Sequence, residues 1–399
     1  MKKKDLLFVF PSLSAGGGEK SLINLLFKID YSLYNVDLCL FSKSGVFLNS
    51  LPQEVNILEV DNEYKTFTRN VLISFLCFSM KLQFNLAFSR LMFTILNRVI
   101  VNNSISEQYT WKYISKSFSC LDKEYDAAIG FLEKSSIYFI VDKVKAKKKI
   151  GWIHTNYTDS GMDKSFDEPY FKKLNYIVTV SEQCANSLRE TFGNLAGKIK
   201  VIYNILSPDV IKHLSNNIEV EEIEKRDGYT YIITLARLSV EKGIDIAINT
   251  CKLLVRKGYK VRWLVLGDGT DRDKLQKMID TLGIKDNFKL IGIKENPYPF
   301  IRKSHIYVQP SRYEGKSIAI DEAKILCKPI VITNFETAKD QILHEIDGII
   351  VDVSEEALSK GIEKLITNSK LRENLISNLS EQKLGTEEEI NKLYLMINE

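Results

Sequence analysis

The sequence predicts an α/β protein built from two Rossmann-like domains, each a doubly wound parallel sheet. Short apolar runs alternate along the chain with stretches of helical period, which is the pattern of parallel strands joined by crossover helices. The pattern stops near residue 207 and starts again near residue 228. The length of 399 residues, with 45% hydrophobic and 27% charged residues, suits two hydrophobic cores better than one.

The first domain is predicted over residues 1–207. Its first strand is Leu6–Phe10, which a glycine loop at Gly16–Gly18 connects to a helix over Glu19–Ile29. Val36–Phe41 is expected to form the second strand. Further buried strands are predicted at 127–131, 150–153 and 177–180, each followed by a polar loop.

The second domain is predicted over residues 228–380 and repeats the alternation. Residues 208–227 are expected to form a linker region, because Pro208 ends one unit and an acidic run precedes Asp227-Gly228. Residues 381–399 are expected to form a C-terminal helix that packs back on the N-terminal domain. The predicted strands are 231–235, 261–266, 289–291, 306–308 and 330–333, and the helices are 244–257, 271–282 and 317–327.

Ligands of doubly wound sheets bind at the carboxyl ends of the strands. Two such domains in tandem are therefore expected to face each other across a cleft that holds the ligand.

The cysteines and the N-terminus favour a cytoplasmic protein. The six cysteines are far apart and form no C-x-x-C pair, so neither a zinc site nor a disulfide framework is expected. The start of the chain imitates a signal peptide, but its apolar core is shorter than about 7 residues and stops at Pro11. No uncharged apolar stretch approaches the roughly 18 residues that cross a bilayer.

Residues 65–106 combine cations with aromatic residues and contain no acidic residue. One interpretation is that the phenylalanines pack on the N-domain sheet and the cations form a solvated face. The other is a peripheral contact with the anionic inner face of the cell membrane. Nucleic acid is not expected as a partner, because the net charge of +4 is small and no binding motif appears. The cations of the segment are Lys65, Arg69, Lys81, Arg90 and Arg98.

Three segments carry residues suited to a ligand with a diphosphate. The first is Gly16-Gly17-Gly18, where backbone N–H groups at a helix N-terminus could meet an anion. A tight turn explains the same glycines, and the spacing before Lys20-Ser21 does not match a P-loop. The second segment places Arg237 and Lys242 between a strand end and a helix. The alternative there is a surface ion pair, such as Arg237 with Glu241.

The third segment follows the strand that ends near Val308. Glu314 lies in a loop, and a helix is expected to start near Gly315 with Glu322 about two turns into it. Free N–H groups of Lys316 and Ser317 are expected to meet phosphate or sugar oxygens, while the two carboxylates accept hydrogen bonds from hydroxyls. Alternatively, Glu314 caps the helix and Glu322 is solvated.

Seven segments in order resemble the family 4 retaining glycosyltransferases of the GT-B fold, of the bacterial surface-polysaccharide type. The resemblance spans most of the chain. The segments are the glycine loop, Gly151-Trp152-Ile153-His154-Thr155-Asn156, Val180-Ser181-Glu182, Ile202-Tyr203-Asn204, Ala236-Arg237-Leu238 with Glu241-Lys242-Gly243, Leu266-Gly267-Asp268-Gly269, and Glu314 with Glu322-Ala323.

The resemblance implies a role for each candidate residue. Arg237 and Lys242 would hold the diphosphate of a nucleotide sugar, with Gly16 and Gly17 beside it, and Glu322 would bind the ribose. Glu314, followed by Gly315, Lys316 and Ser317, would contact the donor sugar, and His154 would face the reacting sugar. The catalytic set is thus His154, Glu314, Arg237 and Lys242.

The resemblance also implies a reaction. A hexose or N-acetylhexosamine would move from a UDP-sugar, with retention, to a lipid-linked glycan acceptor in surface polysaccharide synthesis, such as a capsule. Neither metal nor cofactor is expected; Asp271-Arg272-Asp273 matches a metal-binding D-x-D, but acidic residues also favour a helix start. Lys316 replaces a residue that is usually apolar, which leaves the sugar open. Lys242→Ala and Glu314→Ala are expected to abolish transfer with little change in melting temperature.

Two other functions stay open. A nucleotide-sugar epimerase on the same fold would convert the donor without an acceptor. A non-catalytic partner subunit of a glycosyltransferase would keep the fold without the activity.

Overall fold

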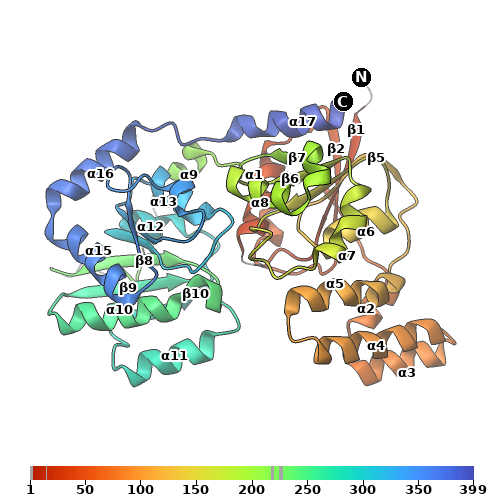
Figure 1. Ribbon diagram of the computed structural model, residues 1–399, viewed down its shortest axis with the longest axis horizontal. Helices are drawn as coiled ribbons and strands as arrows, with labels where there is room; N and C mark the ends of the chain where they lie inside the picture. The colour runs from red at the N-terminus through yellow and green to blue at the C-terminus, as the bar shows by residue number, and fades with distance from the viewer. Residues whose placement is uncertain (1–2, 15, 217–219, 224–227) are drawn as a thin grey trace. The chain divides into compact units, whose positions relative to one another are not determined.

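The computed structural model describes residues 3–14, 16–216, 220–223 and 228–399, and the chain forms two compact units. The first comprises Gly18–Asn204, Glu388–Glu399 and the N-terminal residues as far as Ser14. The second comprises Ile205–Glu387 together with Gly16 and Gly17. Each unit is built around its own parallel sheet (Figure 1).

The sheet of the first unit has seven parallel strands in the order β3-β2-β1-β4-β5-β6-β7. The order reverses between β1 and β4, where Leu6 lies opposite Ala127. Loops that follow these two strands leave the sheet in opposite directions, which opens a binding position at their carboxyl ends. The strands are β1 Lys4–Phe10, β2 Tyr34–Leu40, β3 Val55–Leu58, β4 Glu124–Gly130, β5 Lys145–Ile153, β6 Tyr176–Thr179 and β7 Ile199–Val201.

Helices cover both faces of this sheet, and a group of them lies at its edge (Figure 1). The middle of the sheet is fully apolar, since five consecutive residues of β1, from Leu6 to Phe10, are buried. This is typical of a strand covered on both faces. The helices are α1 Gly17–Lys28, α2 Asn62–Phe67, α3 Val71–Met80, α4 Phe84–Val99, α5 Asn103–Ile114, α6 Ser135–Lys143, α7 Lys164–Lys172, α8 Glu182–Thr191 and α17 Ile390–Asn398.

The sheet of the second unit has six parallel strands in the order β10-β9-β8-β11-β12-β13, with its reversal between β8 and β11. The strands are β8 Thr230–Leu235, β9 Val261–Leu266, β10 Phe288–Gly292, β11 Ile306–Gln309, β12 Ile330–Thr333 and β13 Ile349–Val351. The helices are α9 Pro208–Leu214, α10 Ile244–Arg256, α11 Arg272–Thr281, α12 Tyr298–Lys303, α13 Ile318–Ile325, α14 Ala338–Gln341, α15 Glu355–Thr367 and α16 Ser369–Glu381.

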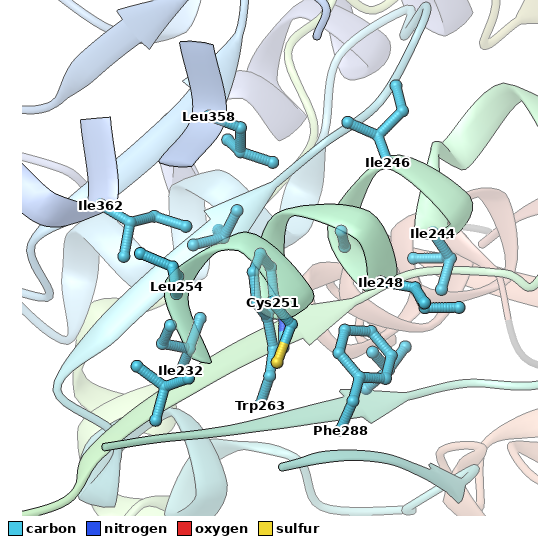
Figure 2. Packing of buried hydrophobic residues seen from close by; sticks show 14 of the residues in the cluster. Ile232, Ile244, Ile246, Ile248, Cys251, Leu254, Trp263, Phe288, Leu358 and Ile362 are labelled. Atoms are coloured by element: carbon cyan, nitrogen blue, oxygen red, sulfur yellow. The ribbon is translucent and has the colours of Figure 1, made fainter. Parts of the chain in front are cut away.

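A dense apolar layer fixes α10 and α15 on this sheet. Cys251 and Leu254 of α10 lie near Trp263 of β9, and Leu358 and Ile362 come from α15 (Figure 2). All five side chains are fully buried. Burying a leucine or isoleucine side chain stabilises the fold by about 1.5–3 kcal/mol. The loops at the strand ends therefore rise from a rigid base.

Part of the range that the sequence assigns to a linker lies in the second unit instead. Residues 208–214 form helix α9, with Pro208 at the first helical position, and Ile211 packs in the core of that unit. The sequence prediction assigned these residues to a linker because of the acidic run that follows them, and it missed the amphipathic helical turn. At the other end of the chain, Tyr394 of α17 stacks on Tyr34 with ring centroids 5.0 Å apart, so α17 packs on the first unit.

Within the described parts of the chain, no helix is both long enough and apolar enough to cross a membrane. The six cysteines all lie in the part of the chain that the structure describes, and none of them forms a disulfide bond.

Candidate functional site

Three loops interlock at the carboxyl ends of the strands of the second unit. The loop after β8 meets the loop after β9, because Leu238 N–H donates to Asp268 O over 3.1 Å and Asp271 N–H donates to Leu238 O over 3.0 Å. The loop after β8 also meets the loop after β11, at Gly243, whose φ is +64°. A Cβ on Gly243 would lie 2.0 Å from Pro310 O, so only glycine fits there.

Arg312 joins the same loops with its side chain. It donates to Val240 O over 2.7 Å and binds Asp245 at the start of α10 with two bonds of 2.9 and 2.7 Å. This contact lowers the pKa of Asp245 and raises the pKa of Arg312. The sequence prediction missed Arg312, although it is a cation in the same loop as Glu314 and Lys316, which was already expected to bind the ligand.

Glu314 and Lys242 form an ion pair where two of these loops meet. Lys242 Nζ lies 2.6 Å from Glu314 Oε2, and the Glu314 side chain is only 8% exposed. The other oxygen, Oε1, accepts from Ser311 Oγ at 2.8 Å and from Gln309 Nε2 at 3.2 Å. Thr337 fixes the backbone by donating to Glu314 O over 3.0 Å. The carboxylate is therefore held in one orientation, with Oε2 on the side of the lysine.

The pair leaves capacity for a ligand. A lysine ammonium has three donors, and Lys242, 24% exposed, gives one of them to Glu314. Arg237 lies on the same loop and is exposed, and no carboxylate among the described residues pairs with it. The alternative of an Arg237–Glu241 ion pair is wrong, because Glu241 Oε1 accepts from Ser239 Oγ instead.

Glu322 lies on the buried side of α13. It is 1% exposed, and Tyr298 OH donates to its Oε1 over 3.1 Å. The alternative of a solvated Glu322 is therefore wrong. A helix cap by Glu314 is also wrong, because α13 begins at Ile318 and Ser317 precedes it.

The prediction for Ser317 needs a correction. Its N–H is not free for a phosphate, because it donates to Gln341 Oε1 over 2.9 Å, and Gln341 Nε2 donates back to Ser317 O over 2.8 Å. Gly315, Lys316 and Ser317 form a loop rather than the first turn of a helix. Lys316 lies 3.8 Å from Asp321 and is 14% exposed.

In the N-terminal half of the chain, the glycine loop follows β1. Helix α1 begins at Gly17, and a Cβ there would meet no described atom within 4 Å. Packing in the described structure therefore does not require glycine at this position. A backbone N–H at a helix start without a covering side chain suits an anion.

His154 follows β5 and is half-buried. Its Nε2 lies 3.1 Å from Phe131 O. Because a carbonyl only accepts, this contact requires the proton on Nε2 and leaves Nδ1 as the acceptor nitrogen of the ring. Burial lowers the pKa of His154 to about 4, so the ring is neutral at pH 7.

Glu133, which follows β4, supports His154 and was missed by the sequence prediction. Its Oε2 accepts from His154 N–H over 3.1 Å, and burial raises the pKa of Glu133. The next residue, Lys134, has a φ of +65°. A positive φ is costly for a residue with a side chain and is most often kept at functional sites. The turns that carry Glu133 and His154 follow β4 and β5, which are neighbouring strands of the sheet.

The D-x-D sequence begins helix α11. Asp271 precedes the first helical residue, and Arg272 lies 3.6 Å from Asp268. In the residues that the structure describes, no group of three or more His, Cys, Asp or Glu side chains could hold a metal ion.

Residues 215–382 match the model of the family described as glycosyl transferases group 1. The capsular polysaccharide biosynthesis glycosyltransferase CapM of Staphylococcus aureus is 30% identical over 208 residues, which cover 50% of this chain and 54% of that protein. The poly(ribitol-phosphate) α-N-acetylglucosaminyltransferase of S. aureus (strain COL) is 24% identical over 253 residues, or 60% and 50% of the two chains. The chain spans about half the length of the curated relatives it matches.

Solved structures match over nearly the whole chain. HepE of Anabaena in complex with UDP and glucose has a TM-score of 0.71 at 16% identity and covers 99% of both chains. TarM of S. aureus, solved with fondaparinux, α-GlcNAc-glycerol and UDP, has a TM-score of 0.67 at 15% identity and covers 99% of this chain and 100% of that one. At such identities the likeness shows the fold. Together with the two parallel sheets, it confirms the predicted GT-B class, while the predicted cleft stays a prediction.

Proposed function

We propose that the protein is a retaining, metal-independent glycosyltransferase of family 4 that moves a hexose or N-acetylhexosamine from a UDP-sugar to a glycan acceptor. The observation that carries the proposal is the Lys242–Glu314 pair in the interlocked loops, together with Glu322 buried on α13, in a segment that matches the group 1 family. Relatives named for polysaccharide and glycan transfer support it.

The second unit would bind the donor. Arg237 and Lys242 neutralise the diphosphate, which gains charge as the sugar–phosphate bond breaks. Glu322 accepts hydrogen bonds from the ribose hydroxyls. Glu314 accepts a sugar hydroxyl at Oε2, because its Oε1 already receives two hydrogen bonds from the protein.

The proposal also assigns roles to residues in the N-terminal half of the chain. The N–H groups at Gly16 and Gly17 bind the diphosphate, and Nδ1 of the neutral His154 accepts a hydroxyl of the reacting sugar. The bond from the anomeric carbon to the phosphate oxygen breaks while the bond to the acceptor oxygen forms on the same face. The acceptor proton passes to the departing phosphate, so no carboxylate nucleophile is needed.

The acceptor in this proposal is a lipid-linked glycan of a surface polysaccharide such as a capsule. The enzyme then works in the cytoplasm, at the inner face of the cell membrane. The relatives named for capsular polysaccharide and poly(ribitol-phosphate) support a surface polysaccharide as the acceptor.

A panel of nucleotide sugars tests the proposal in two steps. Thermal shift with UDP, GDP and several UDP-sugars identifies the donor, since a ligand that binds the native state raises the melting temperature. Transfer of labelled sugar to lipid-linked acceptors is then measured for the wild type, Glu314→Gln and Lys242→Met.

We expect the two site variants to lose transfer by roughly a hundredfold or more, which is the size typical for a group that stabilises developing charge. The matched control is Lys257→Met, because Lys257 pairs with Glu363 in the same unit at 2.5 Å but away from the strand ends. Full activity of Glu314→Gln would contradict the site. Conversion of the UDP-sugar without any acceptor would favour the epimerase instead.

A further inference from the structure

Helices α3 and α4 form an antiparallel hairpin that belongs to neither face of the first sheet. The two helices lie against each other and α4 lies against α5, at the edge of the first unit (Figure 1). The hairpin shares a small core with α2, formed by Phe67 of α2, Phe78 of α3 and Ala87 of α4. Its outer side is therefore not needed to hold it in place.

That outer side is strongly apolar. Among the described residues, twelve of the twenty-five large apolar side chains that are exposed lie between Leu72 and Val101. At the turn between the two helices, Met80 is 76% exposed and Leu82 is 75% exposed. We define the hairpin surface as the exposed side chains of Leu72, Leu76, Met80, Leu82, Phe84, Phe88, Leu91 and Ile95.

These side chains form continuous stripes. Leu72, Leu76 and Met80 are spaced four residues apart on α3, which puts them on one face. On α4, the exposed Phe84, Phe88, Leu91 and Ile95 follow spacings of four, three and four, which is again one helix face. Exposed apolar stripes of this extent are typical of an interaction surface.

The charges within residues 65–106 all have one sign. Arg69, Lys81 and Arg98 are exposed, and residues 65–106 contain no acidic residue. Arg90 belongs to the fold rather than to this surface. Its guanidinium donates to Arg69 O over 2.9 Å and lies 5.6 Å from the ring centroids of Phe67 and Phe93.

We propose that the hairpin surface docks on an anionic lipid membrane, with its apolar stripes among the acyl chains and Arg69, Lys81 and Arg98 at the headgroups. An apolar face flanked by cations is the pattern of a helix that lies in the interface. Helix α3, with its 10 residues, is about 15 Å long and cannot cross a bilayer core of about 30 Å. Charge decides between a membrane and a second copy of the chain, because a two-fold interface through this surface brings the same three cations together.

The proposal deepens the proposed function and rests on it in one respect only: docking would bring the enzyme to a lipid-linked acceptor. The docking role of the hairpin surface is inferred from the exposure and charge of its side chains and does not depend on the proposed reaction. Membrane binding and glycosyl transfer can therefore fail separately.

Vesicle flotation of the full chain tests the surface. Vesicles of phosphatidylglycerol with phosphatidylcholine are compared with phosphatidylcholine alone, at low and high salt. We expect binding to the anionic vesicles only, weakened by salt. Phe88→Glu is expected to lower the apparent affinity for the anionic vesicles by about tenfold or more. The reason is that a charge replaces a ring that the docked protein buries in the membrane.

Each variant has a matched control. Phe27→Glu changes a phenylalanine of the same unit that is 59% exposed, against 56% for Phe88, and lies outside the hairpin. The charge variant Arg69→Gln with Lys81→Gln and Arg98→Gln is compared with Lys274→Gln, Lys277→Gln and Lys285→Gln, which remove three exposed cations of the second unit. The controls are expected to bind as the wild type does.

The UDP-induced thermal shift and transfer to a detergent-soluble acceptor are measured on the same variants. Both are expected to stay unchanged in Phe88→Glu, which separates docking from catalysis. Absence of binding to anionic vesicles, equal binding to neutral ones, or equal losses in Phe27→Glu would overturn the proposal. A dimer in light scattering that Phe88→Glu dissociates would overturn it in favour of a second copy.

Discussion

The ion pair of Lys242 and Glu314 gives the sharpest prediction for stability. The pair is mostly buried, with the two side chains 24% and 8% exposed and 2.6 Å between Nζ and Oε2. Removing one partner of a buried pair costs about 3–5 kcal/mol, whereas an exposed pair contributes about 0–1 kcal/mol. Because Lys242 reaches solvent in part, we expect intermediate values.

The two single variants are expected to differ. Lys242→Met leaves the buried carboxylate of Glu314 without its cation and is expected to lower the free energy of unfolding by about 2 kcal/mol. Glu314→Gln is milder, at about 1 kcal/mol, because the lysine can turn to water while the amide oxygen still accepts from Ser311. The double variant should cost about 1 kcal/mol less than the sum of the two.

Urea unfolding of the four proteins, followed by circular dichroism, measures these differences. The matched control is the cycle of Lys257→Met and Glu363→Gln, whose side chains are 46% and 21% exposed. A coupling of at most about 0.5 kcal/mol is expected there. Equal couplings in both cycles, or no change of midpoint in Lys242→Met, would refute the reasoning.

This prediction differs from the one made from the sequence alone, which expects little change in melting temperature when Lys242 or Glu314 is replaced. The sequence shows two charged residues 72 positions apart. It does not show that they bind each other, nor that one of them is buried.

Three further predictions concern other parts of the site. Gly17→Ala is expected to keep or slightly raise the melting temperature, because alanine favours a helix and its side chain finds open space. The same change is expected to weaken UDP binding in calorimetry by about tenfold. An unchanged affinity for UDP would contradict the anion site. His154 has a folded pKa of about 4, below the unfolded value of about 6.5, so unfolded chains take up its proton first on acidification. Its contribution is complete above pH 6.5 and is lost as the pH falls toward 4, by at most roughly 3 kcal/mol, and His154→Gln should flatten that part of the urea-midpoint profile; an unchanged slope would contradict the shift. Arg312→Lys keeps the charge but loses the two-bond contact with Asp245, so we expect a higher KM for the donor with a stability loss of only about 0.5–1 kcal/mol; a wild-type KM would show that the loops do not depend on it.

The alternation of apolar runs and helical stretches predicted both domains and most of their strands. Three strands were missed: β7 and β13, which have only three residues each, and β3, whose four residues are interrupted by the polar Asn56. Runs so short carry almost no periodic signal. They are strands because neighbouring strands already present hydrogen-bonding edges to them, and that depends on the tertiary structure.

The candidate site was predicted as a set of residues but not as a set of contacts. Glycines and charged residues at strand ends mark anion-binding loops, and this signal located Arg237, Lys242 and Glu314. The sequence could not reveal that Gln341, 24 residues further on, occupies the N–H of Ser317. Partners across loops depend on how the chain packs, which local spacing does not encode.

Calorimetric titration with UDP and with uridine tests the central claim most directly, namely that the loop with Arg237 and Lys242 binds a diphosphate. The difference between the two ligands isolates the contribution of the diphosphate. For the wild type we expect UDP to bind much more tightly than uridine, and for Arg237→Gln with Lys242→Met we expect most of that preference to be lost. A double variant that still prefers UDP as strongly as the wild type does would contradict the claim.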